Sequence, residues 1–510
     1  MPAQDAGQRL DERRLFERYL VRQRKHPTVD VDGRQTDVLG EATGIKIRLA
    51  EGVAYGVMAA QAVMTGVARD MMGRSDTVAL LVTLHPFFRT PDPQPGTKYH
   101  TLSETDITTT DWAEIQPRSP FYIFALRDES LLAEYEHGWK ITDVFPVNST
   151  GIQTSRDDLV LDFSVDRLWA RISDIRDLSL PDSTVIDKYN LREMSFWKVS
   201  EARKSLASDK EWESRFISCL YRPFDIRPLF YSSAVVHRTR DEVMRHLSTQ
   251  NRVLCIGRAG QVTGSTEWDV AFCGSKPVDL NIFYRGGGQC FPLYLYPAEG
   301  EMQFEEGRRS NLSPEFIKAA SDKLGLKFVS DGKGDLMETY GPEDVFNYAY
   351  AVFHSPDYRS RYAEFLRIDF PRLPLTSNKE LFKALAEKGA ELVSLHLMEA
   401  PVLEQQRTQI KFDVAGSNVV EKVTYNETAK HAYISKVQYF EGVPPEVWNF
   451  HIGGYQVCQN WLKDRKGRKL SYDELAHYQK IVVAIRETSR MMEEIDEVIE
   501  EHGGWPLDSA

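Results

Sequence analysis

A segment of 28 residues concentrates the side chains that nucleic-acid contacts require. Residues 220–247, LYRPFDIRPLFYSSAVVHRTRDEVMRHL, place arginines and histidines among tyrosine and phenylalanine rings. Guanidinium groups bind phosphates and guanine edges, and the phosphate contacts fix the register of a protein on duplex DNA. We therefore expect DNA contacts from the arginines of this segment, which are Arg222, Arg227, Arg238, Arg240 and Arg245.

Two of these arginines have an equally good structural interpretation. Arg222 and Arg227 flank Pro223-Phe224-Asp225, so an ion pair between one of them and Asp225 inside the fold is the alternative to DNA contact. The other three, within HRTRDEVMRH, are the stronger DNA candidates. The aromatic rings of the segment are expected in the core rather than stacked on bases; they belong to Tyr221, Phe224, Phe230 and Tyr231.

A second basic segment occurs later in the chain. Residues 463–469 carry five cations against Asp464, and we expect an exposed turn that contacts the phosphate backbone through Lys463, Arg465, Lys466 and Arg468. The formal net charge of the chain is −12, yet residues 222–258 hold seven arginines against three acids, so an acidic protein still presents a basic surface. The alternative for both segments is an ordinary solvated face.

The sequence lacks the signatures of enzymes that modify or cut DNA. Amino-methyltransferases hold a flipped base with a [DNS]PP[YF] loop, and the nearest segment, residues 119–122 (SPFY), lacks the second proline. The glycine clusters at 257–264 and 286–288 are expected to form turns rather than a cofactor site. No P-loop and no Glu-x-Lys of a nuclease occurs. We expect no catalytic, cofactor-binding or metal-ligating residue in this chain.

Composition and length indicate an ordinary globular protein of the cytoplasm. With 510 residues, 42% of them apolar, the chain can form two to four domains. Its five cysteines form no CxxC pair, so neither a disulfide framework nor a zinc ribbon is expected. The sequence opens on no signal peptide, and the longest uncharged apolar run, residues 53–68, is shorter than a membrane span. We expect no membrane partner.

The pattern of apolar residues predicts a mixed α+β fold, because strands and helices do not alternate strictly. Asp157 and Asp158 are expected as a turn and cap. Strands are predicted at 77–84, 121–126, 158–163 and 253–256. A polar amino-terminal helix up to about residue 25 is expected, and further helices are predicted at 53–72, 165–176, 344–354 and 378–399.

Three helices carry additional detail. The helix at 165–176 is expected to bury one face, formed by Val165, Leu168, Trp169 and Ile172. A short helix at 241–247 is predicted with Thr239 as its N-cap. The last helix is long and runs from a capping box, Ser471 with Glu474, to Glu501. The pair Gly453-Gly454 suits a tight turn, and His451 beside it is expected in the core.

Three segments together resemble a known family. They are GWKITDVFPVNSTGIQTSRDDLVLDF at 138–163, the basic segment at 220–247, and VPPEVWNFHIGGYQVCQNWL at 443–462. They resemble the carboxy-terminal target-recognition region of type ISP single-polypeptide restriction-modification enzymes and of related adenine-specific DNA methyltransferases. The resemblance extends over most of the chain from about residue 112 to residue 500.

The resemblance implies a division of labour. In such enzymes nuclease, helicase and methyltransferase domains precede the recognition domain, and the first 110 or so residues of this chain cannot hold them. We expect a polar helix or tail at 1–44, the end of a methyltransferase-like domain with a mixed-sheet remnant at 45–165, and a larger α+β target-recognition domain at 166–510. S-adenosylmethionine is then expected on a partner chain or a missing domain.

The sequence therefore supports one leading hypothesis and two alternatives. The leading hypothesis is a sequence-specific recognition module for double-stranded DNA that works with a methyltransferase subunit and a nuclease or helicase subunit in restriction-modification or phage defence. The first alternative is a split or divergent adenine-specific DNA methyltransferase that a partner chain completes. The second is an interaction protein of a defence system that does not bind DNA.

Overall fold

The computed structural model describes residues 79–81, 113–115, 128–258, 268–284, 287–297 and 307–507. Contacts divide the chain into two compact units, Met1–Asp128 and Glu129–Ala510. In the first unit, β1 (Ala79–Leu81) pairs antiparallel with β2 (Ala113–Ile115) and falls within the strand predicted at 77–84. The elements predicted at 1–25, 53–72 and 121–126, and the SPFY segment, lie outside the described residues.

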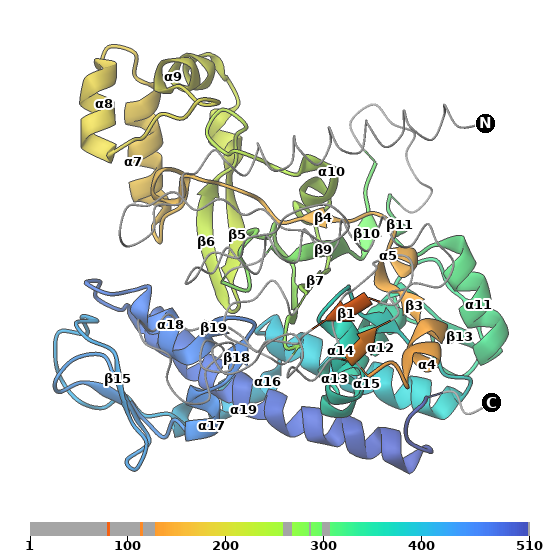
Figure 1. Cartoon of the computed structure of the whole chain (residues 1–510). Helices are drawn as coiled ribbons and strands as arrows, with labels where there is room; N and C mark the ends of the chain where they lie inside the picture. Colours follow the sequence, from red (N-terminus) through yellow and green to blue (C-terminus); the bar gives the residue numbers. More distant parts are fainter. Residues whose placement is uncertain are drawn as a thin grey trace, which may run out of the picture. The chain divides into compact units, whose positions relative to one another are not determined.

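A four-stranded antiparallel sheet lies within the second unit (Figure 1). Its strands, in spatial order, are β4 (Ser149–Thr150), β9 (Gln289–Pro292), β7 (Val253–Ile256) and β8 (Ala271–Gly274). Every residue of β7 and β8 is buried, as a continuous apolar run predicts for a strand covered on both faces. The strand predicted at 253–256 is confirmed. Segments on both sides of residue 165 contribute to this one sheet.

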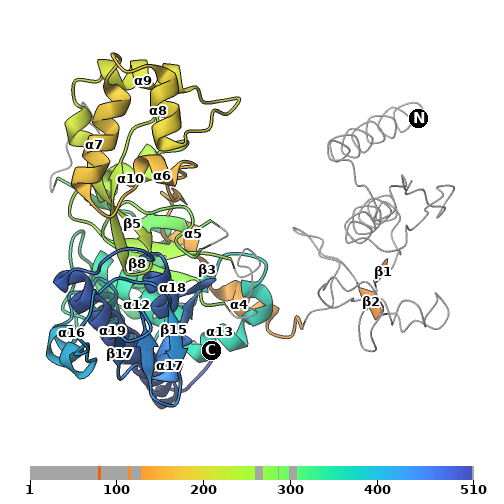
Figure 2. The same cartoon turned by 90° about the vertical axis from the view of Figure 1, so that its left-hand side faces the viewer.

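Three helices lie together at one end of the second unit: α7 (Val165–Arg176), α8 (Asp182–Tyr189) and α9 (Val199–Ser208) (Figure 1, Figure 2). The long helix α19 (Tyr472–Glu501) lies at the other end. The guanidinium of Arg203, whose side chain is buried, donates to the carbonyl oxygens of Ile175 (3.0 Å) and Leu180 (2.8 Å) and forms an ion pair with Asp182. One side chain of α9 thus fixes the end of α7 and the start of α8.

The helix predicted at 165–176 is confirmed as α7, and Ser164 caps it by accepting from the backbone N–H of Arg167. Leu168 and Ile172 are buried as predicted. Val165 and Trp169 are not, since 48% and 38% of their surface stays exposed. The buried stripe of α7 is therefore narrow, and the side of the helix that carries Val165 and Trp169 is partly exposed to solvent.

The hairpin of β5 (Phe216–Arg222) and β6 (Asp225–Phe230) packs beside α7. The chain reverses at Pro223-Phe224, where Phe224 has a φ of 61°. The ring of Trp169 on α7 stacks on Phe216 at the start of the hairpin, with ring centroids 4.9 Å apart. The aromatic rings predicted for the core are there in two cases, Phe224 and Phe230, which are 3% and 0% exposed.

Three long helices cover the other side of the unit. They are α12 (Pro342–His354), α15 (Lys379–His396) and α19 (Tyr472–Glu501), and α15 packs against both others. A Cβ atom at Gly389 of α15 would come within 1.8 Å of the backbone oxygen of Asn347 on α12, so only glycine permits this approach. All three predicted helices are confirmed, and the predicted capping box of Ser471 and Glu474 begins α19.

The remaining elements are short. Besides the 3-10 turns Trp212–Arg215, Arg245–Leu247 and Arg407–Gln409, the helices are α4 (Leu132–His137), α5 (Ile141–Val144), α6 (Asp157–Val160), α10 (Asp241–Met244), α11 (Pro314–Leu324), α13 (Pro356–Arg361), α14 (Ala363–Leu366), α16 (Pro401–Gln406), α17 (Pro445–Trp448) and α18 (Val457–Lys463). The strands are β3 (Trp139–Lys140), β10 (Tyr294–Leu295), β11 (Arg309–Ser310), β12 (Lys327–Phe328), β13 (Thr339–Tyr340), β14 (Arg372–Leu373), β15 (Thr424–Asn426), β16 (His431–Tyr433), β17 (Tyr439–Glu441), β18 (His451–Ile452) and β19 (Tyr455–Gln456).

Two predictions of local secondary structure are wrong. The segment 158–163 is not a strand, because α6 occupies Asp157–Val160 and only Leu161 forms an isolated bridge, to Leu229. A short apolar run has no period that separates helix from strand, and here the hydroxyl of Tyr221, 2.9 Å from Asp157, helps to fix the helical turn. Thr239 is not an N-cap; Arg240 precedes α10 with a φ of 61°.

Candidate nucleic-acid interface

The basic segment 220–247 spans the β5–β6 hairpin, a loop and α10, and the fold divides its arginines into two groups. Arg222 and Arg227 lie on the hairpin and point into the unit, with side chains 10% and 11% exposed. Arg238 and Arg245, on the loop and after α10, are exposed at the surface. The two groups have opposite surroundings, although they come from one continuous stretch of sequence.

The buried group is organised by Asp225, whose side chain is 0% exposed. Its Oδ2 accepts from Nε (2.9 Å) and Nη2 (2.6 Å) of Arg227, and its Oδ1 accepts from Nη2 of Arg465 at 2.8 Å. Burial alone would raise the pKa of Asp225, but the charges of Arg465 and Arg227 hold it below its ordinary value. Arg227 also contacts Asp464 at 3.2 Å. The cluster is a closed ion-pair network within the fold.

Arg222 has a partner of its own. Its Nη1 donates to Oδ1 of Asp279 at 2.8 Å, and its guanidinium lies 3.9 Å from the ring centroid of Tyr221. Burial raises the pKa of Asp279 to about 6 even though the arginine charge opposes the shift. The ion pair with Asp225 that the sequence offered as an alternative therefore exists for Arg227, while Arg222 pairs elsewhere. DNA contact by either arginine stays a prediction.

The second group consists of Arg238 and Arg245, which are exposed, and Arg240, which is half-buried. The backbone of Arg238 pairs with Gln153, and no hydrogen bond or ion pair joins its guanidinium to the described part of the chain. Arg240 is half-buried and adopts a left-handed backbone conformation, and its Nε is buried without a hydrogen-bond partner among the described residues. Within the described part of the chain, the Arg245 guanidinium donates to the carbonyl oxygen of Tyr296 at 3.0 Å and to no acid. These cations are available to a ligand.

The second basic segment, after α18, divides in the same way. Lys463 and Lys466 are exposed, and the ammonium of Lys463 donates to the side-chain oxygen of Gln459 at 2.5 Å, with no ion pair to an acid among the residues that the structure describes. Arg465 was expected on an exposed turn, and this is wrong: the residue is 5% exposed and belongs to the Asp225 cluster. Arg468 is half-buried, with its guanidinium 3.8 Å from the ring centroid of Phe163. Asp225 is the first residue of β6, and it accepts from Arg465 two residues after the end of α18.

A known protein family matches the greater part of the chain. The family model of the Type ISP C-terminal specificity domain matches residues 143–494. The chain belongs to this family. The resemblance to type ISP enzymes that the sequence predicted is confirmed. The name of the domain, a specificity domain, refers to the recognition of DNA sequence that the resemblance implied. No curated protein sequence matches the chain.

Solved structures of longer chains share the fold of this chain. A cryo-EM structure of a DrdV–DNA complex has 19% identity and a TM-score of 0.57, over 78% of this chain and 41% of that one. A nuclease-deletion mutant of the Type ISP enzyme LlaGI, in complex with a DNA substrate mimic, has 20% identity and a TM-score of 0.54, over 78% and 31%. The ATP-dependent Type ISP enzyme LlaBIII bound to DNA has 17% identity and a TM-score of 0.55, over 75% of this chain and 25% of that one. The likeness shows the α+β fold, and this chain spans less than half of each relative.

Sequence reasoning missed one surface feature of the specificity domain. Phe196, in the loop between α8 and α9, is 57% exposed, and its ring stacks on His237 with centroids 4.5 Å apart. His237 precedes Arg238, so this aromatic pair adjoins the exposed arginines. The available signal was Phe196-Trp197, two adjacent rings of which only Trp197 is buried.

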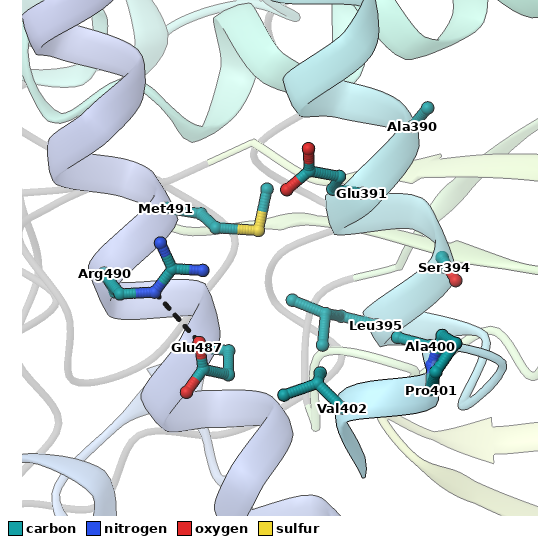
Figure 3. A pocket seen from close by; sticks show the side chains of 10 residues that line it. All are labelled: Ala390, Glu391, Ser394, Leu395, Ala400, Pro401, Val402, Glu487, Arg490 and Met491. Carbon is teal, nitrogen blue, oxygen red and sulfur yellow. Dashed lines mark hydrogen bonds and ion pairs between the residues drawn. The ribbon is translucent and has the colours of Figure 1, made fainter. Parts of the chain in front are cut away.

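A pocket of about 410 Å³ lies elsewhere, between α15, α16 and α19 (Figure 3). The side chains of Leu395, Val402 and Met491 form its apolar wall, and the ion pair of Glu487 and Arg490, at 2.9 Å, borders it. None of the predicted site residues lines it.

The described residues hold no group of three or more metal-ligating side chains and no helix long and apolar enough to cross a membrane. The five cysteines are buried and unpaired. His451, which was expected in the core, is exposed, and its Nδ1 lies 2.6 Å from the carbonyl oxygen of Asn449.

Proposed function

We propose that this chain recognises a specific sequence in double-stranded DNA and serves as the reading module of a restriction-modification system. The observation that carries the proposal is the match to the Type ISP specificity domain over residues 143–494. The three related structures are DNA complexes or DNA-mimic complexes by their descriptions, which supports duplex DNA as the ligand here.

The division of the arginines indicates which side chains touch DNA. A cation that is already paired inside the fold gains little from a phosphate, because it must first give up a desolvated ion pair. Arg238, Arg240 and Arg245 have donors free of acidic partners, as do Lys463 and Lys466. We therefore assign DNA contact to these five, and a structural role to Arg222, Arg227 and Arg465.

The chemistry of the system is proposed to reside outside the described residues. The relatives are multi-domain enzymes, so methyltransferase, nuclease or helicase activity, with S-adenosylmethionine as cofactor, would come from a partner chain or from further domains. The end of a methyltransferase-like domain is proposed within residues 45–165, and the recognition domain is proposed to comprise residues 166–510 together with the segment from residue 143, because β4 belongs to its sheet and the family match begins there. A cytoplasmic location is proposed, and the five unpaired cysteines support a reducing compartment.

Selection of a randomised duplex library on the purified chain at two salt concentrations tests the proposal. We expect one enriched motif that persists at the higher salt concentration, because base contacts are less screened than phosphate contacts. Arg238→Ala should weaken binding and lower the slope of log K against log salt by about 0.9, the contribution of one phosphate. Arg367→Ala is the matched control, since Arg367 is exposed but pairs with Glu364 on α14.

Three outcomes count against the proposal. Binding without an enriched motif would indicate non-specific electrostatic binding to phosphates and would contradict sequence recognition. No binding at either salt concentration would contradict DNA recognition altogether. Heat released on titration with S-adenosylmethionine by the isolated chain would support the alternative, a divergent methyltransferase.

A further inference from the structure

Three loops of the recognition unit lock together beside the exposed arginines. They are residues 153–156, 190–198 and 232–240. The indole N–H of Trp197 donates to the carbonyl oxygen of Ala234 at 2.8 Å, and Nε of Arg156 donates to that of Val235 at 2.8 Å. The Arg156 guanidinium also lies 4.3 Å from the Trp197 ring centroid. The backbones of Gln153 and Arg238 are hydrogen-bonded in both directions, at 3.0 Å each. Each loop is thus held by the other two.

This locked arrangement presents an aromatic pair to solvent. Met194 and Trp197 exchange backbone hydrogen bonds of 3.0 and 3.2 Å, which places Phe196 in the tight turn between them. The Phe196 ring is nearly parallel to His237, at 19°, and the His237 ring nitrogen Nδ1 lies 3.2 Å from the hydroxyl of Ser155. A rigid, exposed phenylalanine costs hydration free energy unless a partner covers it.

The surroundings of the pair are cationic. The three loops contain five cations (Arg156, Arg192, Lys198, Arg238, Arg240) and one acid, Glu193, which already pairs with Lys198. Nη1 of Arg156 and Nε of Arg240 are buried without hydrogen-bond partners among the described residues. The acids that follow in α6 and α10 are partly engaged, since Asp157 accepts from Tyr221 and Asp241 from Tyr231. Asp158 and Glu242 remain exposed.

The state of His237 fits an apolar contact. Partial desolvation, together with the charges of Arg238 and Arg156, lowers the pKa of His237 below its usual value. Since the ordinary histidine pKa of about 6.5 already lies below 7, the lowered pKa favours the neutral imidazole, and the stacked pair forms an aromatic surface between arginines.

We propose that the Phe196–His237 pair contacts the bases of duplex DNA, while Arg238 holds a neighbouring phosphate. A phenylalanine ring packs on thymine methyl groups or inserts at a base step, and both contacts depend on sequence. The inference deepens the proposed function and rests on it. In this proposal the Phe196–His237 pair discriminates between DNA sequences, and the arginines supply the part of the affinity that depends on salt.

The test compares variants on the duplex enriched by selection and on a scrambled duplex, by fluorescence anisotropy at two salt concentrations. Phe196→Ala should lower affinity for the enriched duplex about tenfold, leave the scrambled duplex unchanged and keep the salt slope. Arg238→Ala should weaken both duplexes and lower the slope. Met337→Ala, at a residue 66% exposed in another loop, is the matched control and should behave as wild type.

The outcomes separate this inference from the proposed function. Unchanged discrimination by Phe196→Ala, on a wild-type chain that does enrich a motif, would overturn the base contact and leave DNA recognition standing. A wild-type chain that enriches no motif would overturn both.

A second measurement does not depend on the folding of a variant. A 5-iodopyrimidine at each pyrimidine of the motif should photo-crosslink the wild-type chain at residues 194–197 or 237. Cross-links confined to other peptides would contradict the assignment.

Discussion

The Asp225 cluster makes the sharpest prediction about stability. Asp225→Asn keeps the shape of the side chain but removes the charge between Arg227 and Arg465, whose side chains are 11% and 6% exposed. The hydrogen bonds of 2.6, 2.8 and 2.9 Å then lose their charge assistance, and the amide NH2 faces guanidinium donors. Two buried cations would remain with Asp464 and Glu474 as their only close acids among the described residues.

The expected loss is about 3–5 kcal/mol of unfolding free energy, the usual effect of removing one partner from a buried ion pair. Urea denaturation followed by tryptophan fluorescence measures it, and Trp461 is a suitable reporter because Arg465 lies 3.4 Å from its ring centroid. Asp158→Asn is the control, since Asp158 is exposed, and should change stability by less than about 0.5 kcal/mol.

A loss below about 1 kcal/mol for Asp225→Asn would refute the reasoning, because it would mean that the two arginines find solvent or other partners without cost.

Variants of the two arginines in the same cluster distinguish a structural role from DNA contact. Arg227→Met and Arg465→Met should destabilise the chain and leave the salt slope of DNA binding unchanged. A reduced slope in either variant would return that arginine to the DNA interface.

Three further predictions concern the core. Burial lowers the pKa of His396 to about 3 and also lowers the pKa of His354, so both imidazoles are neutral in the folded chain but take up a proton in the unfolded chain below pH 6.5. The free energy of unfolding should therefore fall by about 1.4 kcal/mol per pH unit for each histidine as the pH drops below 6.5. Urea midpoints measured from pH 7 to pH 5 test this, and His396→Gln should remove the contribution of one histidine. Gly389→Ala should cost about 3 kcal/mol or more by forcing a Cβ onto the Asn347 carbonyl, measured by thermal unfolding; a wild-type midpoint would contradict the close packing. Arg203→Leu should leave backbone carbonyls of the α7–α8 region unpaired and accelerate proteolysis there, while equal cleavage rates would argue against its role.

The sequence determined the elements whose signals are local. The helices α15 and α19 are long and bury one apolar face, α12 is a largely apolar run that is buried on nearly all sides, and the Ser471 capping box involves only residues three apart. The strand at 253–256 is apolar throughout and lies between Arg252 and Gly257. The family resemblance also rests on contiguous segments, which is why residues 220–247 could be predicted as part of a DNA-recognition region.

Only the tertiary structure decided which arginines are free. Asp225 and Arg465 are 240 residues apart in sequence, so no local pattern shows that this arginine is consumed by an ion pair, whereas Arg238 remains exposed. The exposed Phe196 depends likewise on contacts among three separate loops. Charge and ring content are properties of the sequence, but burial and pairing arise from long-range packing, and these select the side chains left for a ligand.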